Sequence, residues 1–188
     1  MKVCIVPFVT INWGSGSGKT FAMHLTWSNC IALENLDLSS WDVSDLNVTT
    51  IYQCWYCCHH LKSLNVKNWN TTKWTVNSTN GLYHLFGYCR MLVDIDLSNW
   101  NTTNWAPVRA DCMFLNNNKR RNFDDIKNWN TTNWKIVQFN DAFNGCNKIQ
   151  ELDLRNWNVS GWKVNTLSYT FANMSSVRKI DLTGWDTS

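Results

Sequence analysis

Tryptophan recurs through this chain at a nearly constant interval, and this period restricts the folds that the chain can adopt. The sequence has 188 residues, of which 13 are tryptophan. Seven of these are separated by 28, 28, 31, 29, 28 and 28 residues, and they are Trp13, Trp41, Trp69, Trp100, Trp129, Trp157 and Trp185. Because a fixed period of about 20 to 50 residues is the signature of repeat architectures, we interpret each interval as one structural repeat.

Three further kinds of residue keep the same register after the repeat tryptophan. An aromatic follows fourteen residues on, at Trp27, Trp55, Phe143 and Phe171, and at Phe86 after a three-residue insertion. A cysteine or methionine follows seventeen residues on, at Cys30, Cys58, Cys146 and Met174, and at Cys89 with the same insertion. A second tryptophan lies five residues after the first in four repeats, at Trp74, Trp105, Trp134 and Trp162. The repeat therefore covers about residues 5–188.

Each repeat also carries the pattern L-x-x-L-x-L-x-x-W, for example from Leu33 to Trp41. The last two leucines, Leu36 and Leu38, alternate with polar residues, which predicts a short strand with both leucines on one face. The next such strand lies one repeat further on, so the strands must stack in parallel. Stacked coils bury a continuous core that one coil cannot bury alone. The segment between strands, such as residues 46–61, is compatible with a helical turn, a 3₁₀ turn or irregular coil.

We therefore expect residues 1–188 to form a single β-rich solenoid of the leucine-rich-repeat type. It has about seven stacked coils of ~28 residues and a parallel sheet on one face. Residues 1–12 are predicted to form an N-terminal edge strand. The coils begin near Trp13, Trp41, Trp69, Trp100, Trp129 and Trp157, and a partial coil begins at Trp185.

Two repeats depart from the pattern. In the fourth, the cysteine position is occupied by Asn117 or Asn118, and we expect an irregularity near Asp124 and Asp125. In the third, the insertion at residues 76–80 predicts a protruding turn.

Composition excludes several classes of protein. Charged residues make up 16% of the chain and aromatics 14%, which does not fit an intrinsically disordered chain. No stretch approaches the roughly 18 uninterrupted apolar residues of a membrane span, so none is expected. The net charge of +3 and the single basic run, residues 119–121, are too weak to indicate a nucleic-acid partner.

Three segments resemble one family of repeat proteins. Residues 92–105 read L-V-D-I-D-L-S-N-W-N-T-T-N-W, residues 143–149 read F-N-G-C-N-K-I, and residues 182–188 read L-T-G-W-D-T-S. This pattern resembles the leucine-rich repeats of the BspA-like surface-protein family. The resemblance implies a β-solenoid with an adhesive or partner-binding role, an extracellular or cell-surface location, and no catalytic residues or cofactor. The period here is longer than is usual in that family, and the second tryptophan replaces a smaller residue.

Two local motifs suggest other chemistry. Residues 14–20, G-S-G-S-G-K-T, resemble a phosphate-binding loop, but that motif needs glycine where this chain has Trp13, a repeat position. Residues 54–60, C-W-Y-C-C-H-H, resemble a zinc or redox cluster, but Cys54 and Cys58 lie on the core register. We therefore expect neither an enzyme nor a metal site. The sequence does not decide whether stacked cysteines such as Cys58 and Cys89 form a disulfide.

A column of polar residues precedes the repeat tryptophans by four positions. It comprises Asp37, Asn65, Asp96, Asp125, Asp153 and Asp181, accompanied two residues later by Lys67, Lys127 and Arg155 among others. The flanking leucines point inward, so these residues are expected to point outward and to bind a protein partner. The alternatives are a solvated face that neutralises its own charge, and, with less weight, a Ca²⁺ site.

The two ends suggest a different role. Val3 and Ile5 at one end, and Leu182 and Trp185 at the other, belong to apolar strand positions that no capping repeat covers. Exposed strand edges pair with other chains, so self-association end to end into a fibre or particle is an alternative, as is a longer surface protein of which this is a part.

Sequons of the form N-x-[ST] also recur, and no signal peptide is evident in residues 1–12. The glycosylation candidates are Asn77, Asn70, Asn101 and Asn130. Asn77 is favoured because it lies in the insertion, whereas the other three belong to the repeat's own turn.

Overall fold

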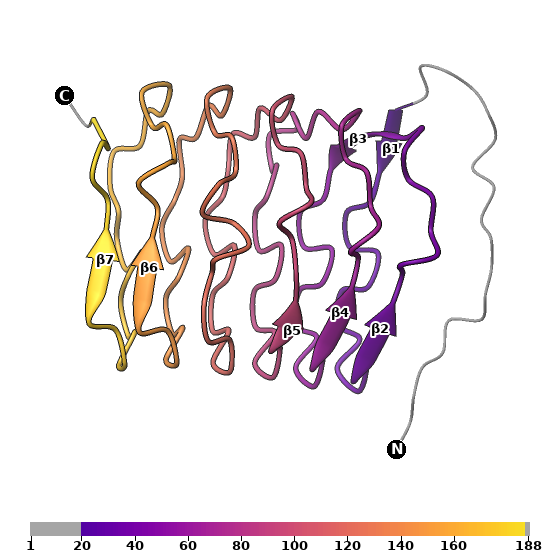
Figure 1. Ribbon diagram of the computed structural model, residues 1–188, viewed down its shortest axis with the longest axis horizontal. Coiled ribbons are helices and arrows are strands. Elements are labelled where there is room, and N and C mark those ends of the chain that lie inside the picture. The colour runs from indigo at the N-terminus through magenta and orange to yellow at the C-terminus, as the bar shows by residue number, and fades with distance from the viewer. Residues whose placement is uncertain (1–19, 187–188) are drawn as a thin grey trace.

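The computed structural model describes residues 20–186, and over this range the chain forms seven short strands and no helix. Figure 1 shows successive turns of the chain lying side by side along the longest axis of the molecule. The strands are β1 (Thr20–Ala22), β2 (Asn35–Asp37), β3 (Asn47–Thr50), β4 (Ser63–Asn65), β5 (Asp94–Ile95), β6 (Glu151–Asp153) and β7 (Lys179–Asp181). The protein is therefore all-β over the described residues.

The strands pair in parallel, and paired residues are one repeat apart. One sheet has the order β2-β4-β5, a second consists of β6 and β7, and a third consists of β1 and β3. Leu36 pairs with Leu64 and Leu152 with Ile180, each 28 residues apart. The strand predicted from the alternating leucines is thus present. The segment that the sequence left open contains β1 and β3 and a series of turns, with no helical turn in the described range.

The pairing is interrupted in the fourth repeat. Between β5 and β6 no strand is formed, and residues 124–128 form a turn where the strand was expected. The irregularity predicted near Asp124 and Asp125 is confirmed. The insertion in the third repeat also forms a turn, which is closed by the bond from the Gly81 amide to the Ser78 carbonyl (3.0 Å).

Aromatic rings stack in columns through the core because equivalent residues of neighbouring repeats lie above one another. Trp100 lies between Trp69 and Trp129, with ring centroids 6.3 and 6.2 Å away and planes within 5° of parallel. Offset stacking of this kind is a favourable arrangement of aromatic rings. Eight tryptophans are buried, namely Trp55, Trp69, Trp74, Trp100, Trp105, Trp129, Trp134 and Trp157, so the rings are core and not an exposed stripe.

A second column joins the aromatics at the fourteenth position. Trp55 stacks on Trp27 at 5.4 Å and on Phe86 at 5.0 Å, and the column continues to Phe171. Its fourth-repeat member is Phe114, which lies 5.7 Å from both Phe86 and Phe143. Phe114 follows Trp100 by fourteen residues, so the register that identified the other members also applies to it.

Buried cysteines link the repeats through hydrogen bonds. The thiols of Cys58, Cys89 and Cys146 donate to the carbonyl oxygens of Trp27, Trp55 and Phe114 in the preceding repeat, at 3.1, 2.9 and 3.3 Å. Burial raises the pKa of Cys146 to about 12, which keeps its thiol protonated and able to donate. In the fourth repeat, Asn117 takes this place and donates to the Phe86 carbonyl at 2.7 Å. No disulfide joins the described cysteines.

The W-N-T-T turn, which occurs at residues 69–72, 100–103 and 129–132, is closed by its own side chains. Asn101 accepts a bond from the Thr103 amide (3.0 Å), and the buried Thr102 donates to the Asn130 carbonyl of the next repeat (3.0 Å). An Asn side chain that accepts a hydrogen bond from the backbone amide two residues later stabilises a turn locally, independently of core packing. These bonds confirm that Asn101 belongs to the repeat's own turn, as the sequence predicted.

The chain reverses direction through residues in the left-handed region. Two positions per repeat, twelve and sixteen residues after the repeat tryptophan, have φ between 49° and 76°, allowing for the insertion. They are Leu25, Asn29, Gln53, Cys57, His84, Tyr88, Cys112, Asn116, Asp141, Gly145, Tyr169 and Asn173. Only one is glycine, although this conformation is unfavourable for other residues. The ladder of hydrogen bonds between repeats must therefore impose it.

Several sequence predictions fall outside the described residues. These are the N-terminal edge strand at residues 1–12 with Val3 and Ile5, the first repeat tryptophan Trp13, and the glycine-rich residues 14–19.

We expect Trp100→Ala to lower the free energy of unfolding by about 3–5 kcal/mol, because it removes a fully packed ring from the middle of a column. Trp185→Ala is the matched control, since Trp185 is only partly buried and should cost less. Thermal melts followed by circular dichroism would measure both. An unchanged melting temperature for Trp100→Ala would contradict the assignment of the rings to the core.

Candidate interaction surfaces

The polar column predicted on the strand face is present in two separate stretches. Asp37 pairs with Asn65 at the ends of β2 and β4, and Asp96 follows β5 directly. Asp153 pairs with Asp181 at the ends of β6 and β7. The fourth repeat separates the two stretches, so the column is not continuous.

Each member of the column closes the turn that follows its strand. The amides of Ser39, Ser98 and Thr183 donate to Asp37, Asp96 and Asp181 at 2.9, 2.9 and 3.1 Å. Asn65 and Asp153 accept the same bond from Lys67 and Arg155 at 3.4 and 3.2 Å. These are Asx turns, and they give the column a structural role in every repeat that has it.

The same hydrogen bonds stabilise the ionised carboxylates. Hydrogen bonds from the hydroxyl and amide of Ser39 lower the pKa of Asp37, and those of Ser98 and Thr183 lower the pKa values of Asp96 and Asp181. Hydrogen bonding to Arg155 lowers the pKa of Asp153 to about 2.

The predicted cations distribute unevenly along the column. Arg155 pairs with Asp153 at 2.8 Å and approaches Asp181 at 3.5 Å, and Lys179 lies 3.3 Å from Asp181. Lys127 instead pairs with Asp124, which is not in the column, at 3.6 Å. The β6–β7 stretch is therefore largely neutralised. Among residues 20–186 no cluster of acidic, histidine or cysteine side chains is arranged to hold a metal ion, which gives the Ca²⁺ alternative no support.

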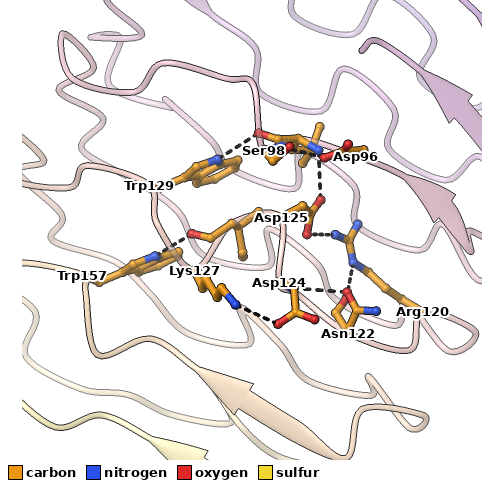
Figure 2. Close-up of polar contacts among 11 residues, drawn as sticks. Asp96, Ser98, Arg120, Asn122, Asp124, Asp125, Lys127, Trp129 and Trp157 are labelled. Carbon is orange, nitrogen blue, oxygen red and sulfur yellow. Dashed lines mark hydrogen bonds and ion pairs between the residues drawn. The ribbon is translucent and has the colours of Figure 1, made fainter.

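Asp125 was predicted to point outward with the column, and this is wrong. Figure 2 shows its carboxylate turned toward Arg120, and only 9% of the Asp125 side chain is exposed. Its Oδ2 accepts a bond from the Leu97 amide at 3.1 Å. In the regular repeats the equivalent amides of Leu38 and Leu154 donate to a backbone carbonyl, that of Asn65 or Asp181. The extra residue in the fourth repeat displaces that carbonyl, and the carboxylate replaces it.

Arg120 completes this buried pair. It occupies the first leucine position of the fourth repeat, where the side chain is 3% exposed. Its guanidinium donates to Asp125 and to the Asn122 carbonyl and lies over the ring of Phe123, 4.5 Å from the centroid (Figure 2). The pair therefore holds the irregular repeat in register with its neighbours.

The remaining candidate residues lie in different settings. Leu182 and Trp185 are partly buried in the last described repeat, where Trp185 donates to the Leu154 carbonyl at 3.0 Å. Asn70, Asn101 and Asn130 each accept the backbone bond of their own turn. Asn77 is exposed in the insertion, as predicted.

A cluster of aromatic and charged side chains, which we call the tyrosine patch, was not predicted. It consists of Tyr56, Tyr83, His84, Tyr88 and Arg109. His84 contacts all three tyrosine rings, at centroid distances of 4.7, 4.3 and 6.2 Å. The Arg109 guanidinium lies 3.9 Å above the Tyr83 ring. Its members occupy different positions in the repeat, so a search for periodic residues does not find them.

Burial and hydrogen bonds fix the charges in the tyrosine patch. Desolvation lowers the pKa of His84 to about 4, so its ring is neutral at pH 7. Arg109 is held by two bonds to Asp111, at 2.9 and 2.7 Å. The three tyrosine rings remain partly exposed. The patch therefore presents aromatic surface and one oriented cation.

Comparison with known proteins places the chain in a family. The family model described as "Mycoplasma protein of unknown function, DUF285" matches residues 21–119 and 108–188. Since these matches cover well over half of the chain, the protein belongs to this family. No curated protein and no solved structure matches the sequence. Among the described residues there is no helix long and apolar enough to cross a bilayer.

The column predicts a specific pH dependence of stability. The pKa values of Asp37, Asp96 and Asp181 are lowered in the folded protein. Their contribution is therefore present above the unfolded value of about 3.9 and is lost as the pH falls below it. We expect Asp37→Asn/Asp96→Asn/Asp181→Asn to melt nearly as the parent at pH 7 and to lose less stability by pH 2.5. Asn65 closes the equivalent turn with its side-chain amide, so an asparagine should preserve the turn in each of these positions.

The matched control is the triple alanine variant, which removes the turn bonds themselves. It should be destabilised at pH 7 as well as in acid. Equal melting of the asparagine and alanine variants at pH 7 would mean that these turns contribute nothing.

Arg120→Ala should lower the free energy of unfolding by about 3–5 kcal/mol, because it leaves the buried Asp125 carboxylate unpaired. Arg121→Ala is the control, since its exposed side chain should cost about 0.5 kcal/mol or less. Urea titration of both variants would measure the difference. Similar midpoints for the two would show that the buried pair does not hold the fourth repeat.

Proposed function

We propose that this protein is a non-enzymatic leucine-rich-repeat solenoid that binds a protein partner at a cell surface. The solenoid is supported by pairing between residues 28 apart and by the continuous aromatic columns. The surface role is supported by the resemblance of residues 92–105 and 143–149 to BspA-like repeats. The stacked repeats make a rigid framework on which exposed side chains keep fixed positions.

The tyrosine patch is the observation that carries this proposal. Tyrosine and arginine are enriched among residues that dominate binding energy in protein interfaces. Tyrosine buries a large area and loses little conformational freedom on binding. Three of the chain's five tyrosines gather here around His84. Their mutual contacts restrict the ring orientations before any partner binds, which lowers the entropic cost of association.

The strand face remains the second candidate surface for the same function. Asp37 and Asp96 have no ion pair among the described side chains, whereas Asp153 and Asp181 do. An electropositive partner would therefore meet the β2-β4-β5 sheet rather than β6 and β7. Charged rim contacts of this kind contribute more to association rate and specificity than to affinity.

Binding of the purified chain to a panel of immobilised extracellular-matrix proteins tests the proposal. We expect Tyr83→Ala to weaken binding by about tenfold or more, as loss of a central aromatic does. Tyr169→Ala is the matched control, because Tyr169 is 69% exposed and lies outside the patch. Melting curves must first show that both variants fold.

The outcomes separate the candidate surfaces. Loss of binding in Asp37→Asn/Asp96→Asn, with Tyr83→Ala unaffected, would transfer the site to the strand face. Absence of binding to every protein on the panel would contradict the adhesive role. Protease accessibility of the protein on intact cells would test the surface location.

End-to-end assembly is the alternative function, and one feature of the last described repeat favours it. Val159, Trp162, Leu167 and Trp185 line a cavity of about 120 Å³, and Leu167 is 39% exposed. A second copy of the chain, or further repeats, would cover these apolar side chains, beside which Ser160 and Asp186 also line the cavity. Sedimentation as a monomer at all concentrations would contradict assembly, and Leu182→Asp should abolish it if it occurs.

A further inference from the structure

A row of exposed cations lies along one edge of the stack, where each repeat turns into its strand position. We call it the basic edge and define it as Arg90, Lys119, Arg121, Lys148 and Arg178, all of which are exposed. In Figure 1 these turns lie side by side along the lower edge, below the starts of β5, β6 and β7. The four turns are residues 90–93, 118–122, 147–150 and 175–179.

Hydrogen-bond ladders on both sides hold these turns in line. Before the turns, Tyr88 donates to Leu115, Asn116 to Asn144 and Gly145 to Ala172, at 2.6, 2.7 and 3.0 Å. After them, the Val93 amide donates to the Lys62 carbonyl and the Arg178 amide to the Gln150 carbonyl, at 3.0 and 2.8 Å. The backbone therefore spaces successive turns at about 4.8 Å, and the cations follow one another along this edge at differing positions within their turns.

The cations of this row have no carboxylate partner within their own turns. The four turns contain no aspartate or glutamate, although the exposed Asp94 and Glu151 directly follow two of them. None of the five cations forms an ion pair with a carboxylate among residues 20–186. The second repeat differs, because Lys62 pairs with Glu34 at 2.9 Å. The net charge of only +3 thus conceals a segregated strip of positive charge.

We propose that the basic edge binds a linear acidic polysaccharide that carries sulfate or carboxylate groups along its length. A row of closely spaced cations complements a polymer that carries anions along its length, and binding releases the counterions of that polymer. The exposed Asn122, Gln150 and Ser175 lie in the same turns and supply hydrogen-bonding groups for sugar hydroxyls. This row adjoins the tyrosine patch at one end, where the Arg90 guanidinium lies 5.7 Å from the centroid of the Tyr88 ring, and its other four cations belong to later repeats.

The surroundings of the row favour this partner over two other polyanions. Binding of single-stranded nucleic acid uses a series of aromatic side chains on which bases stack. The four turns contain none, and the row meets one such ring where Arg90 lies 5.7 Å from the Tyr88 centroid. Insertion into an anionic bilayer uses exposed apolar residues beside the cations. In these turns Leu92, Ile149 and Val177 pack against the core instead, and Val93 is exposed beside Arg90 in the first turn.

Heparin is the probe for a test by isothermal calorimetry at two salt concentrations. We expect the parent chain to bind heparin, with affinity that falls as salt rises. Arg121→Gln/Lys148→Gln should weaken binding by about tenfold or more. The matched control, Lys135→Gln/Lys163→Gln, removes the same charge from exposed lysines elsewhere on the repeat and should change affinity by about twofold or less.

Three results would overturn the proposal. Equal loss in the two double variants would show that net charge alone governs binding. Tighter binding to a single-stranded DNA oligonucleotide, or to vesicles containing phosphatidylserine, would assign the row to another partner. Failure of the parent chain to bind heparin at low salt would remove the site altogether. Melting curves of both double variants would verify that each is folded.

Discussion

The structure depends on one constraint, which is parallel pairing between residues one repeat apart. Because β2 pairs with β4 and β6 with β7 at a separation of 28 residues, every coil must follow nearly the same path as its neighbour. Equivalent side chains then meet their own counterparts. This explains why the rings of Trp69, Trp100 and Trp129 stack nearly parallel. It also explains why non-glycine residues accept left-handed conformations, since at ten of those twelve positions the amide donates to a carbonyl of the next repeat.

The fourth repeat shows how the stack tolerates a departure from its own pattern. Asn117 replaces the cysteine and makes the equivalent hydrogen bond, while Arg120 replaces a leucine and is neutralised by Asp125. The Asp125 carboxylate in turn accepts the Leu97 amide that a backbone carbonyl accepts elsewhere. Because a buried ion pair is costly to form, we attribute its role here to holding the fourth repeat in position. It joins two regular stretches of strands that would otherwise lose their common register.

The exposed side chains divide the surface into regions of different character. The ends of the strands carry carboxylates bound into their own turns, the tyrosine patch presents aromatic rings around His84, and the basic edge presents unpaired cations. The tyrosine patch and the basic edge meet where Arg90 lies over Tyr88, and the row of cations then continues along the later repeats. Binding of a protein partner and of a polyanion at adjoining surfaces is therefore compatible with a single rigid stack.

The sequence by itself determined the period, the strand positions and the burial of the tryptophans, because a repeat of this length has few ways to bury its apolar residues. It also contained the signal for Phe114, fourteen residues after Trp100. Only the tertiary structure decided the sites. Tyr56, Tyr83 and Tyr88 occupy unrelated repeat positions and meet only through stacking, and Asp125 turns inward because one extra residue displaces a carbonyl. In the sequence, residues 119–121 form one basic run. In the structure Arg120 is buried, and the stacking of repeats places Arg90, Lys148 and Arg178 along the same edge as Lys119 and Arg121. Spacing along the chain fixes which residues share a column, whereas proximity between different columns depends on the path of the whole coil.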